Sequence, residues 1–196
     1  MYGKDSQGIA RPLLVDSNGK MVAASVGGKY AAAVLAGNVY IAANQTAVAL
    51  TQDDALAFTG LVLANPAASG KNLIILEFGY ATTVATPTAT LLGLMVGLDA
   101  GDAAAAITPV NRLIGCSNTS VALPDNDCTL VGTPVLHQLI TSAWSEATTA
   151  GSVMGPHVVD INGSLVLGPG SYVATWSFAT NTAAWQFHFM WEEVPV

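Results

Sequence analysis

The C-terminal segment 172–191 alternates between large apolar and smaller or polar residues, and this alternation constrains the fold more than any other feature. In Trp185–Trp191 (WQFHFMW) an aromatic side chain occupies every second position. A period of two places these aromatic side chains on one face of a β-strand. His188 alternates with them, so we expect it to face solvent or a contact between subunits.

The preceding segment, Tyr172–Ala179, alternates in the same way, and Asn181-Thr182 between the two segments predicts a turn. We therefore predict two strands that form a hairpin. Aromatic side chains bury large apolar areas, so this hairpin is expected to anchor the core. The expected core anchors are Tyr172, Trp176, Phe178, Trp185, Phe187, Phe189 and Trp191.

A second region contains three apolar runs separated by turn-forming residues: Leu61–Ala64, Leu73–Phe78 and Leu91–Leu98. Runs of this length between Gly, Pro and Asn clusters indicate buried strands. The linker Asn65–Asn72 (NPAASGKN) predicts a hairpin connection, because Asn-Pro initiates turns. Its Gly-Lys pair does not make a nucleotide-binding P-loop, which requires Gly at position 65 and Ser or Thr at position 72, where this chain has Asn.

The first 29 residues are polar and rich in glycine, and we predict that 1–29 form an extended arm. The β-sandwich domain is expected to occupy 30–196. The arm carries one apolar island and then the turn Asp16–Gly19, whose Asn-Gly pair is typical of a hairpin. The island and its flanking cation comprise Arg11, Pro12, Leu13, Leu14 and Val15.

The remaining segments predict further short elements. Tyr30–Asn38 (YAAAVLAGN) favours a helical turn because it is rich in alanine. Residues 107–131 form a long irregular excursion, and Thr133–Ala143 is compatible with a strand or a short helix. Asn162-Gly163 indicates another hairpin turn. Together these patterns predict an all-β antiparallel fold of about eight to ten strands.

The chain has few charged residues, and this limits the kinds of partner that it can bind. Only 10% of the 196 residues are charged while 52% are hydrophobic, and the net charge is −7; ordinary domains carry about 25% charged residues. The low charge could simply reflect a β protein rich in small residues. We favour the other explanation, that part of the surface is covered by other subunits. The basic residues are scattered singly, so neither nucleic acid nor an anionic membrane is an expected partner. No secretory signal or spanning helix is recognised, so synthesis in the cytoplasm is expected.

Catalytic and metal-binding patterns are absent from the sequence. Cys116 and Cys128 flank a polar loop and could form a disulfide, although two thiols are favoured for a cytoplasmic protein. Without a CxxC pair, and with dispersed histidines, no zinc site or cofactor is expected. Glu77 could act as a buried general acid, but an outward-facing position is favoured. His137 is expected to be structural, and Glu192-Glu193 to be a solvated strand end.

Several phrases together resemble small structural proteins of tailed bacteriophages that decorate or cement capsids. They are RPLLVDSNGK, GNVYIAANQTAVALT, TGLVLANPAASGKNLIILEFGYA and LVLGPGSYVATWSFATNTAAWQFHFMWEEVP. The resemblance covers most of the chain and implies a jelly-roll-like β-sandwich that assembles on the virion, often as a trimer. It carries over no catalytic residue.

We therefore expect a non-enzymatic virion structural protein, made in the host cytoplasm, whose partners are the major capsid protein and copies of itself in a homotrimer. The arm residues 11–15 are expected to contact the capsid, so deletion of 1–29 should weaken capsid binding. The alternative is a tail or fibre β-sandwich that binds a host surface glycan, for which Trp144 beside a polar loop is the candidate contact. An enzyme that uses Glu77 is the third possibility.

Overall fold

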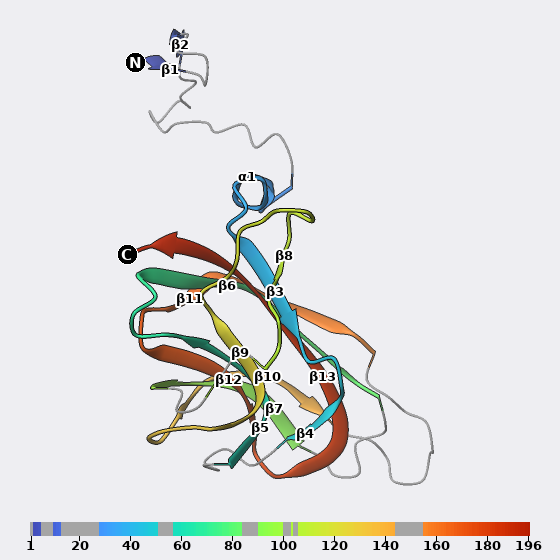
Figure 1. The fold of residues 1–196 in the computed structure, drawn as a ribbon. Coiled ribbons are helices and arrows are strands. Elements are labelled where there is room, and N and C mark those ends of the chain that lie inside the picture. Colours follow the sequence, from blue (N-terminus) through green and yellow to red (C-terminus); the bar gives the residue numbers. More distant parts are fainter. Residues whose placement is uncertain are drawn as a thin grey trace, which may run out of the picture.

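The computed structural model describes residues 2–4, 10–12, 28–50, 57–83, 90–99, 103, 106–143 and 155–196. Two antiparallel sheets pack face to face, which confirms the predicted all-β sandwich (Figure 1). The five-stranded sheet has the order β10-β7-β12-β5-β9, and the six-stranded sheet has the order β11-β6-β13-β3-β8, with β4 also paired to β13. The jelly-roll topology remains a prediction.

The five-stranded sheet comprises β5 (Ala57–Asn65), β7 (Thr90–Leu98), β9 (Leu123–Thr129), β10 (Val135–Ala143) and β12 (Ser171–Ser177). The six-stranded sheet comprises β3 (Val39–Ala43), β4 (Val48–Leu50), β6 (Lys71–Thr82), β8 (Val110–Asn111), β11 (His157–Leu167) and β13 (Asn181–Pro195). One short helix, α1 (Ala31–Leu35), precedes β3, as the alanine-rich segment predicted.

The strands that follow one another along the chain are not neighbours in either sheet. β5 and β6 lie in opposite sheets, and so do β12 and β13. The predicted hairpins at Asn65–Asn72 and at Asn181-Thr182 are therefore wrong, because both connections cross from one sheet to the other. Asn65 secures the first crossing, since its Nδ2 donates to the carbonyl oxygens of Lys71 and Leu167 at 2.8 Å each.

The predicted hairpin at Asn162-Gly163 is also wrong, because β11 continues through both residues. Asn162 and Gly163 have φ values of 56° and 76°, the left-handed conformation that an Asn-Gly pair favours. Here that conformation makes a bulge: Asp160 pairs with Glu77 of β6, and the next paired residue, Leu165, faces Ile75. The turn residues were recognised correctly, but they bend a strand instead of reversing it.

The main core lies between the two sheets and is dominated by β13. Trp185, Phe187, Phe189 and Trp191 are buried there. Their rings pack against each other and against neighbouring strands: Trp185 and Phe187 are stacked with ring centroids 5.8 Å apart, and Phe78 and Phe189 are tilted at 5.1 Å. Because β13 lies between β6 and β3, its inner face is covered by the opposite sheet along most of its length.

β12 is buried on both faces. Val173 faces the main core, whereas Tyr172 and Trp176 belong to a second apolar cluster on the outer face of the five-stranded sheet. Phe178, predicted as a core anchor, is instead 62% exposed. It follows the last residue of β12 and lies on the outer face of the five-stranded sheet, away from the core between the sheets.

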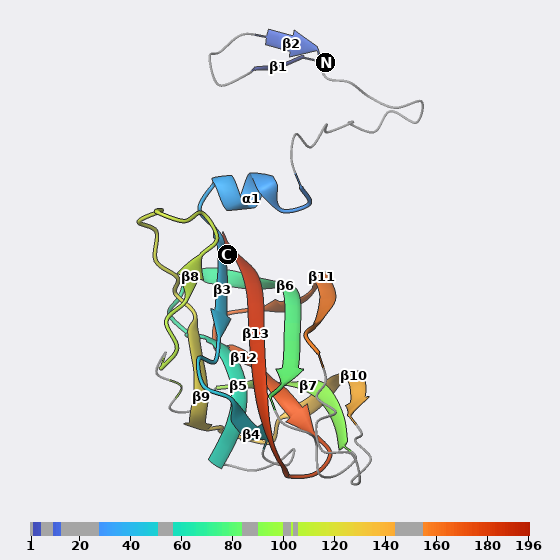
Figure 2. The same cartoon turned by 90° about the vertical axis from the view of Figure 1, so that its right-hand side faces the viewer.

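Helix α1 covers one end of the outer face of the six-stranded sheet (Figure 2). Ala33 and Val34 pack there against a small cluster formed by Val39, Leu76 and Met190. The Tyr30 hydroxyl donates to Oδ1 of Asn162 at 3.1 Å, and Lys29 approaches Asp160 at 3.5 Å. Among the described residues, Lys29 and Tyr30 thus contact the sandwich through β11.

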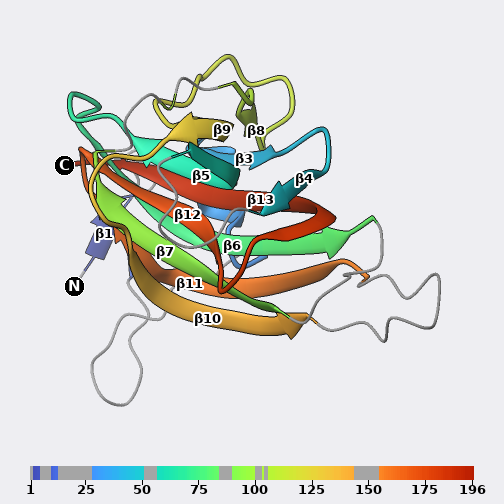
Figure 3. The same cartoon turned by 90° about the horizontal axis from the view of Figure 1, so that it is seen from below.

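The edge strands differ from the sequence-based expectation. Part of the predicted irregular excursion forms β9, which is an edge strand, so Pro124 removes no hydrogen bond from the sheet interior. Residues 133–143, left open between strand and helix, contain the opposite edge strand, β10. Figure 3 shows β10 and β11, the edge strands of the two sheets, on the same flank of the sandwich.

Three short pieces of the predicted arm are described: residues 2–4, 10–12 and 28–29. β1 (Tyr2–Lys4) and β2 (Ala10–Pro12) pair antiparallel in a separate two-stranded sheet. The side chains of Arg11 and Pro12 lie outside the described part, as do Leu13, Leu14, Val15 and the predicted turn Asp16–Gly19.

Candidate functional site

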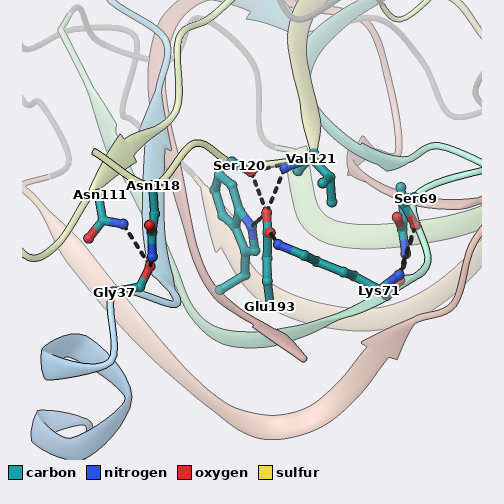
Figure 4. A network of polar contacts seen from close by, with 11 residues as sticks. Gly37, Ser69, Lys71, Asn111, Asn118, Ser120, Val121 and Glu193 are labelled. Carbon is teal, nitrogen blue, oxygen red and sulfur yellow. Dashed lines mark hydrogen bonds and ion pairs between the residues drawn. The ribbon is translucent and has the colours of Figure 1, made fainter. Parts of the chain in front are cut away.

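The most extensive polar network surrounds Glu193, which was predicted to be solvated (Figure 4). Its side chain is 1% exposed and forms an ion pair with Lys71 Nζ at 2.8 Å. Its other carboxylate oxygen accepts hydrogen bonds from the Ser120 hydroxyl at 2.5 Å, from the Val121 amide at 2.9 Å and from Trp191 Nε1 at 3.4 Å. Glu193 thus ties β13 to β6 and to the segment before β9.

The Glu193 carboxylate is satisfied within the protein. One of its oxygens accepts a hydrogen bond from Lys71, and the other accepts from Ser120 and Val121. Burial and the nearby Glu193 carboxylate raise the pKa of Tyr40, whose ring stacks on Trp191 at 6.1 Å. Nearby, the amides of Asn111 and Asn118 both donate to the carbonyl of Gly37, at 2.8 and 3.3 Å, which holds the long excursion against the end of α1.

A polar cleft of about 330 Å³ opens on the six-stranded sheet, at the other end from α1. It is lined by residues of β3, β6, β11 and β13 and by the segments that flank β3 and β11. The lining residues are Ala43, Asn44, Gln45, Tyr80, Ala81, Pro156, His157, Val158, Gln186, Phe187 and His188. None of them carries a formal charge when the histidines are neutral.

His188 is a half-buried titratable group of the polar cleft. It pairs with Gly79 of β6 on one side and with Ala43 of β3 on the other. A Cβ atom at Gly79 would overlap the His188 ring, so the imidazole lies directly over the glycine. Burial lowers the pKa of His188, and Arg112 lowers it further, whereas Glu77 acts in the opposite direction.

A second surface feature is an apolar patch on the outer face of the five-stranded sheet. Leu139 of β10 and Trp176 of β12 lie opposite Gly93 of β7, on its two sides. The backbone amide of Phe178 donates to the carbonyl of Leu91 at 3.3 Å, so these two residues lie beside each other as the next cross-strand pair. We define the apolar patch as Leu91, Leu136, Leu139, Trp176 and Phe178; all but Trp176 are exposed.

The predicted site residues are not brought together. Cys116 is half-buried and Cys128 is buried in the second apolar cluster, and both are present as thiols, not as a disulfide. Glu77 is half-buried opposite Asp160 and Met190, and His137 is exposed at a bulge of β10. Trp144 lies outside the described residues.

The polar cleft and the Glu193 network were both missed from the sequence. Only one signal pointed to the cleft: small residues, Ala43, Gly79 and Ala81, interrupt otherwise large-residue strands. For Glu193 the signal was the alternation itself, because Glu193 continues the period-two series of Trp185–Trp191 on the buried face, whereas the half-buried Glu192 falls on the other face.

No family model matches the chain, and neither a curated protein nor a solved structure is significantly similar to it. Among the described residues, no group of three or more His, Cys, Asp or Glu side chains is placed to hold a metal ion. None of the described helices is long and apolar enough to span a membrane.

Proposed function

We propose that the protein is a structural subunit of a tailed-bacteriophage virion, a decoration or cement protein that binds the head shell and strengthens it. Its partners would be the major capsid protein and further copies of itself, which the resemblance implies as a homotrimer. The apolar patch is the observation that carries the proposal, since a subunit of this kind needs a face that loses water on assembly.

The composition of the apolar patch suits burial against another protein. Phe178 and Leu139 are 62% and 54% exposed, so each leaves much apolar surface in water. The three strands that carry the patch, β7, β10 and β12, contain no Asp, Glu, Lys or Arg. Docking there would remove apolar area from water without desolvating a charge on this chain.

The edge strand β10 favours docking through the face over addition of another strand. Its register against β7 shifts between Leu136 and Gln138 and again between Leu139 and Thr141. Such bulges bend an edge strand and interrupt a regular ladder, which discourages pairing with a further strand. The leucines of the patch remain accessible on the face.

The location of the chain tests the assignment. Antibodies raised against the purified protein would be used for immunogold labelling of gradient-purified virions of the phage that encodes it. Labelled heads are expected. Labelled tails would refute the decoration role and support the tail or fibre alternative, and virions without label would exclude both.

The apolar patch is tested by adding purified protein to heads that lack it. We expect Phe178→Asp to abolish binding, because a carboxylate would be desolvated within the contact. Ile114→Asp is the matched control, since Ile114 is 82% exposed and lies outside the patch. Equal binding by both variants would show that the patch is not the docking face.

The arm has a separate test. Deletion of 1–27 is preferable to deletion of 1–29, because it keeps Lys29 beside Asp160. If the arm contributes to docking, the truncated protein binds heads more weakly while its far-UV circular dichroism spectrum and unfolding midpoint stay unchanged. Full binding by the truncated protein would refute a role for Arg11–Val15.

A further inference from the structure

The polar cleft on the six-stranded sheet has the composition of a small-molecule site. Its volume of about 330 Å³ lies at the lower end of the range for ligand pockets. Ala43 and Ala81 leave room above the sheet, and Val158 and Pro156 add apolar surface. The polar cleft therefore combines a few polar side chains with apolar surface, as many ligand sites do.

The absence of formal charge on the lining restricts the ligand class. None of the described residues that line the cleft is an Asp, Glu, Lys or Arg, so among them a phosphate, a carboxylate or an ammonium group would find no counter-charge. Burying such an ion without a partner is costly. The ligand is therefore expected to be neutral.

The polar side chains of the cleft can both donate and accept hydrogen bonds. The Gln186 carboxamide is exposed and makes no hydrogen bond to another described residue, and the same holds for the ring nitrogens of His188. A carboxamide and a neutral imidazole each offer a donor and an acceptor, as a hydroxyl group does. A ligand rich in hydroxyl groups would match them.

Two rigid features border these groups. The His157 ring stacks on Tyr80 at 5.1 Å and is exposed, so one imidazole face can receive the C–H face of a ring. Asn44 is held in place, since its Nδ2 donates to the carbonyls of Thr46 and Trp185 and its Oδ1 accepts from the Phe187 amide. The wall of the cleft is therefore preorganised.

We infer that the polar cleft binds a neutral saccharide, with the hydroxyl groups hydrogen-bonded to Gln186, Gln45 and His188 and one sugar face against His157. The site lies on the six-stranded sheet, whereas the apolar patch lies on the other sheet. Saccharide binding is therefore independent of docking to the head shell, and either can fail without the other.

The test is a titration of the full-length protein with single sugars, followed by NMR. Probes are the neutral sugars glucose, galactose, mannose and N-acetylglucosamine, their common disaccharides, and sialic acid as a charged comparison. Saturable shifts with at least one neutral sugar are expected. Gln186→Ala should weaken binding about 3- to 10-fold through loss of one or two hydrogen bonds, and Ala81→Trp should abolish it by filling the cleft.

Gln138→Ala is the matched control, because Gln138 is an exposed glutamine on β10 of the opposite sheet. It should bind as the unmodified protein does, and circular dichroism checks that each variant is folded. The inference is overturned if no neutral sugar gives saturable shifts, if sialic acid alone binds, or if Gln186→Ala and Ala81→Trp both bind normally. Binding that persists in Phe178→Asp would establish that the two faces act separately.

Discussion

The ion pair between Lys71 and Glu193 allows a sharp test of how the C-terminal strand is held. Lys71→Met removes the counter-charge of a carboxylate that is 1% exposed. Removing one partner of a buried pair costs about 3–5 kcal/mol, because the remaining charge is uncompensated. Since three neutral donors remain on Glu193, we expect the low end of that range, about 3 kcal/mol.

A second substitution should partly restore stability. In Lys71→Met with Glu193→Gln, the buried group is a neutral amide that needs no counter-charge and can still accept from Ser120 and Val121. The double variant should be less stable than the unmodified protein by about 1–2 kcal/mol, which corresponds to the loss of one or two ordinary hydrogen bonds. Glu193→Gln alone places an amide NH₂ against the Lys71 ammonium and should cost about 1.5–3 kcal/mol.

Urea unfolding, followed by tryptophan fluorescence and by far-UV circular dichroism, measures these free energies when the two transitions coincide. Lys29→Met is the control, because its ion pair with Asp160 is solvent-exposed and should contribute at most about 1 kcal/mol. If the double variant is as unstable as the sum of the single variants, within about 0.5 kcal/mol, the reasoning on the buried charge is refuted.

Three further predictions concern pH, packing and the thiols. Burial lowers the pKa of His188 in the folded state, so its contribution to stability is present above the unfolded pKa of about 6.5 and is lost as the pH falls through the folded pKa; His188→Gln should flatten this decline in melting temperature, and an unchanged decline would contradict it. Gly93→Ala should cost about 1–3 kcal/mol, because its Cβ would lie 2.7 Å from the Gln138 carbonyl oxygen, whereas Gly155→Ala, with open space around it, should be neutral in the same thermal melts. Iodoacetamide should label half-buried Cys116 faster than buried Cys128 in the native protein, and a reductant should leave the melting temperature unchanged; equal labelling rates would argue against these environments.

The strands themselves could be predicted from sequence because alternation is a local property. Trp185–Trp191 alternates, and the structure buries all four of its aromatic side chains. The same logic fails one residue beyond β12: Phe178 continues the alternation of Tyr172 and Trp176 on the outer face of the sheet, but it is 62% exposed there. The alternating pattern identifies which residues share one face of a strand, but it does not say which of them other parts of the protein cover.

Strand pairing could not be predicted in the same way. Asn-Pro, Asn-Gly and Asn-Thr sites all favour turn or left-handed backbone, but a hairpin, a crossing between sheets and a bulge use similar local conformations. Which one forms depends on where the next apolar face can be buried. Here Asn65 bonds to two strands of the opposite sheet, and Asn162-Gly163 bends β11 around β6.

The sequence by itself determined an all-β chain with low charge and a strongly apolar C-terminal strand, because composition and a period of two are local properties that can be read directly from the residues. Only the tertiary structure decided that Glu193 is paired with Lys71, that Phe178 is exposed and that small residues of separate strands leave a cleft beside His188. These properties depend on what lies across the sandwich or in the adjoining strand. Such contacts join residues more than a hundred positions apart, as Lys71 and Glu193 are, and no local pattern encodes them.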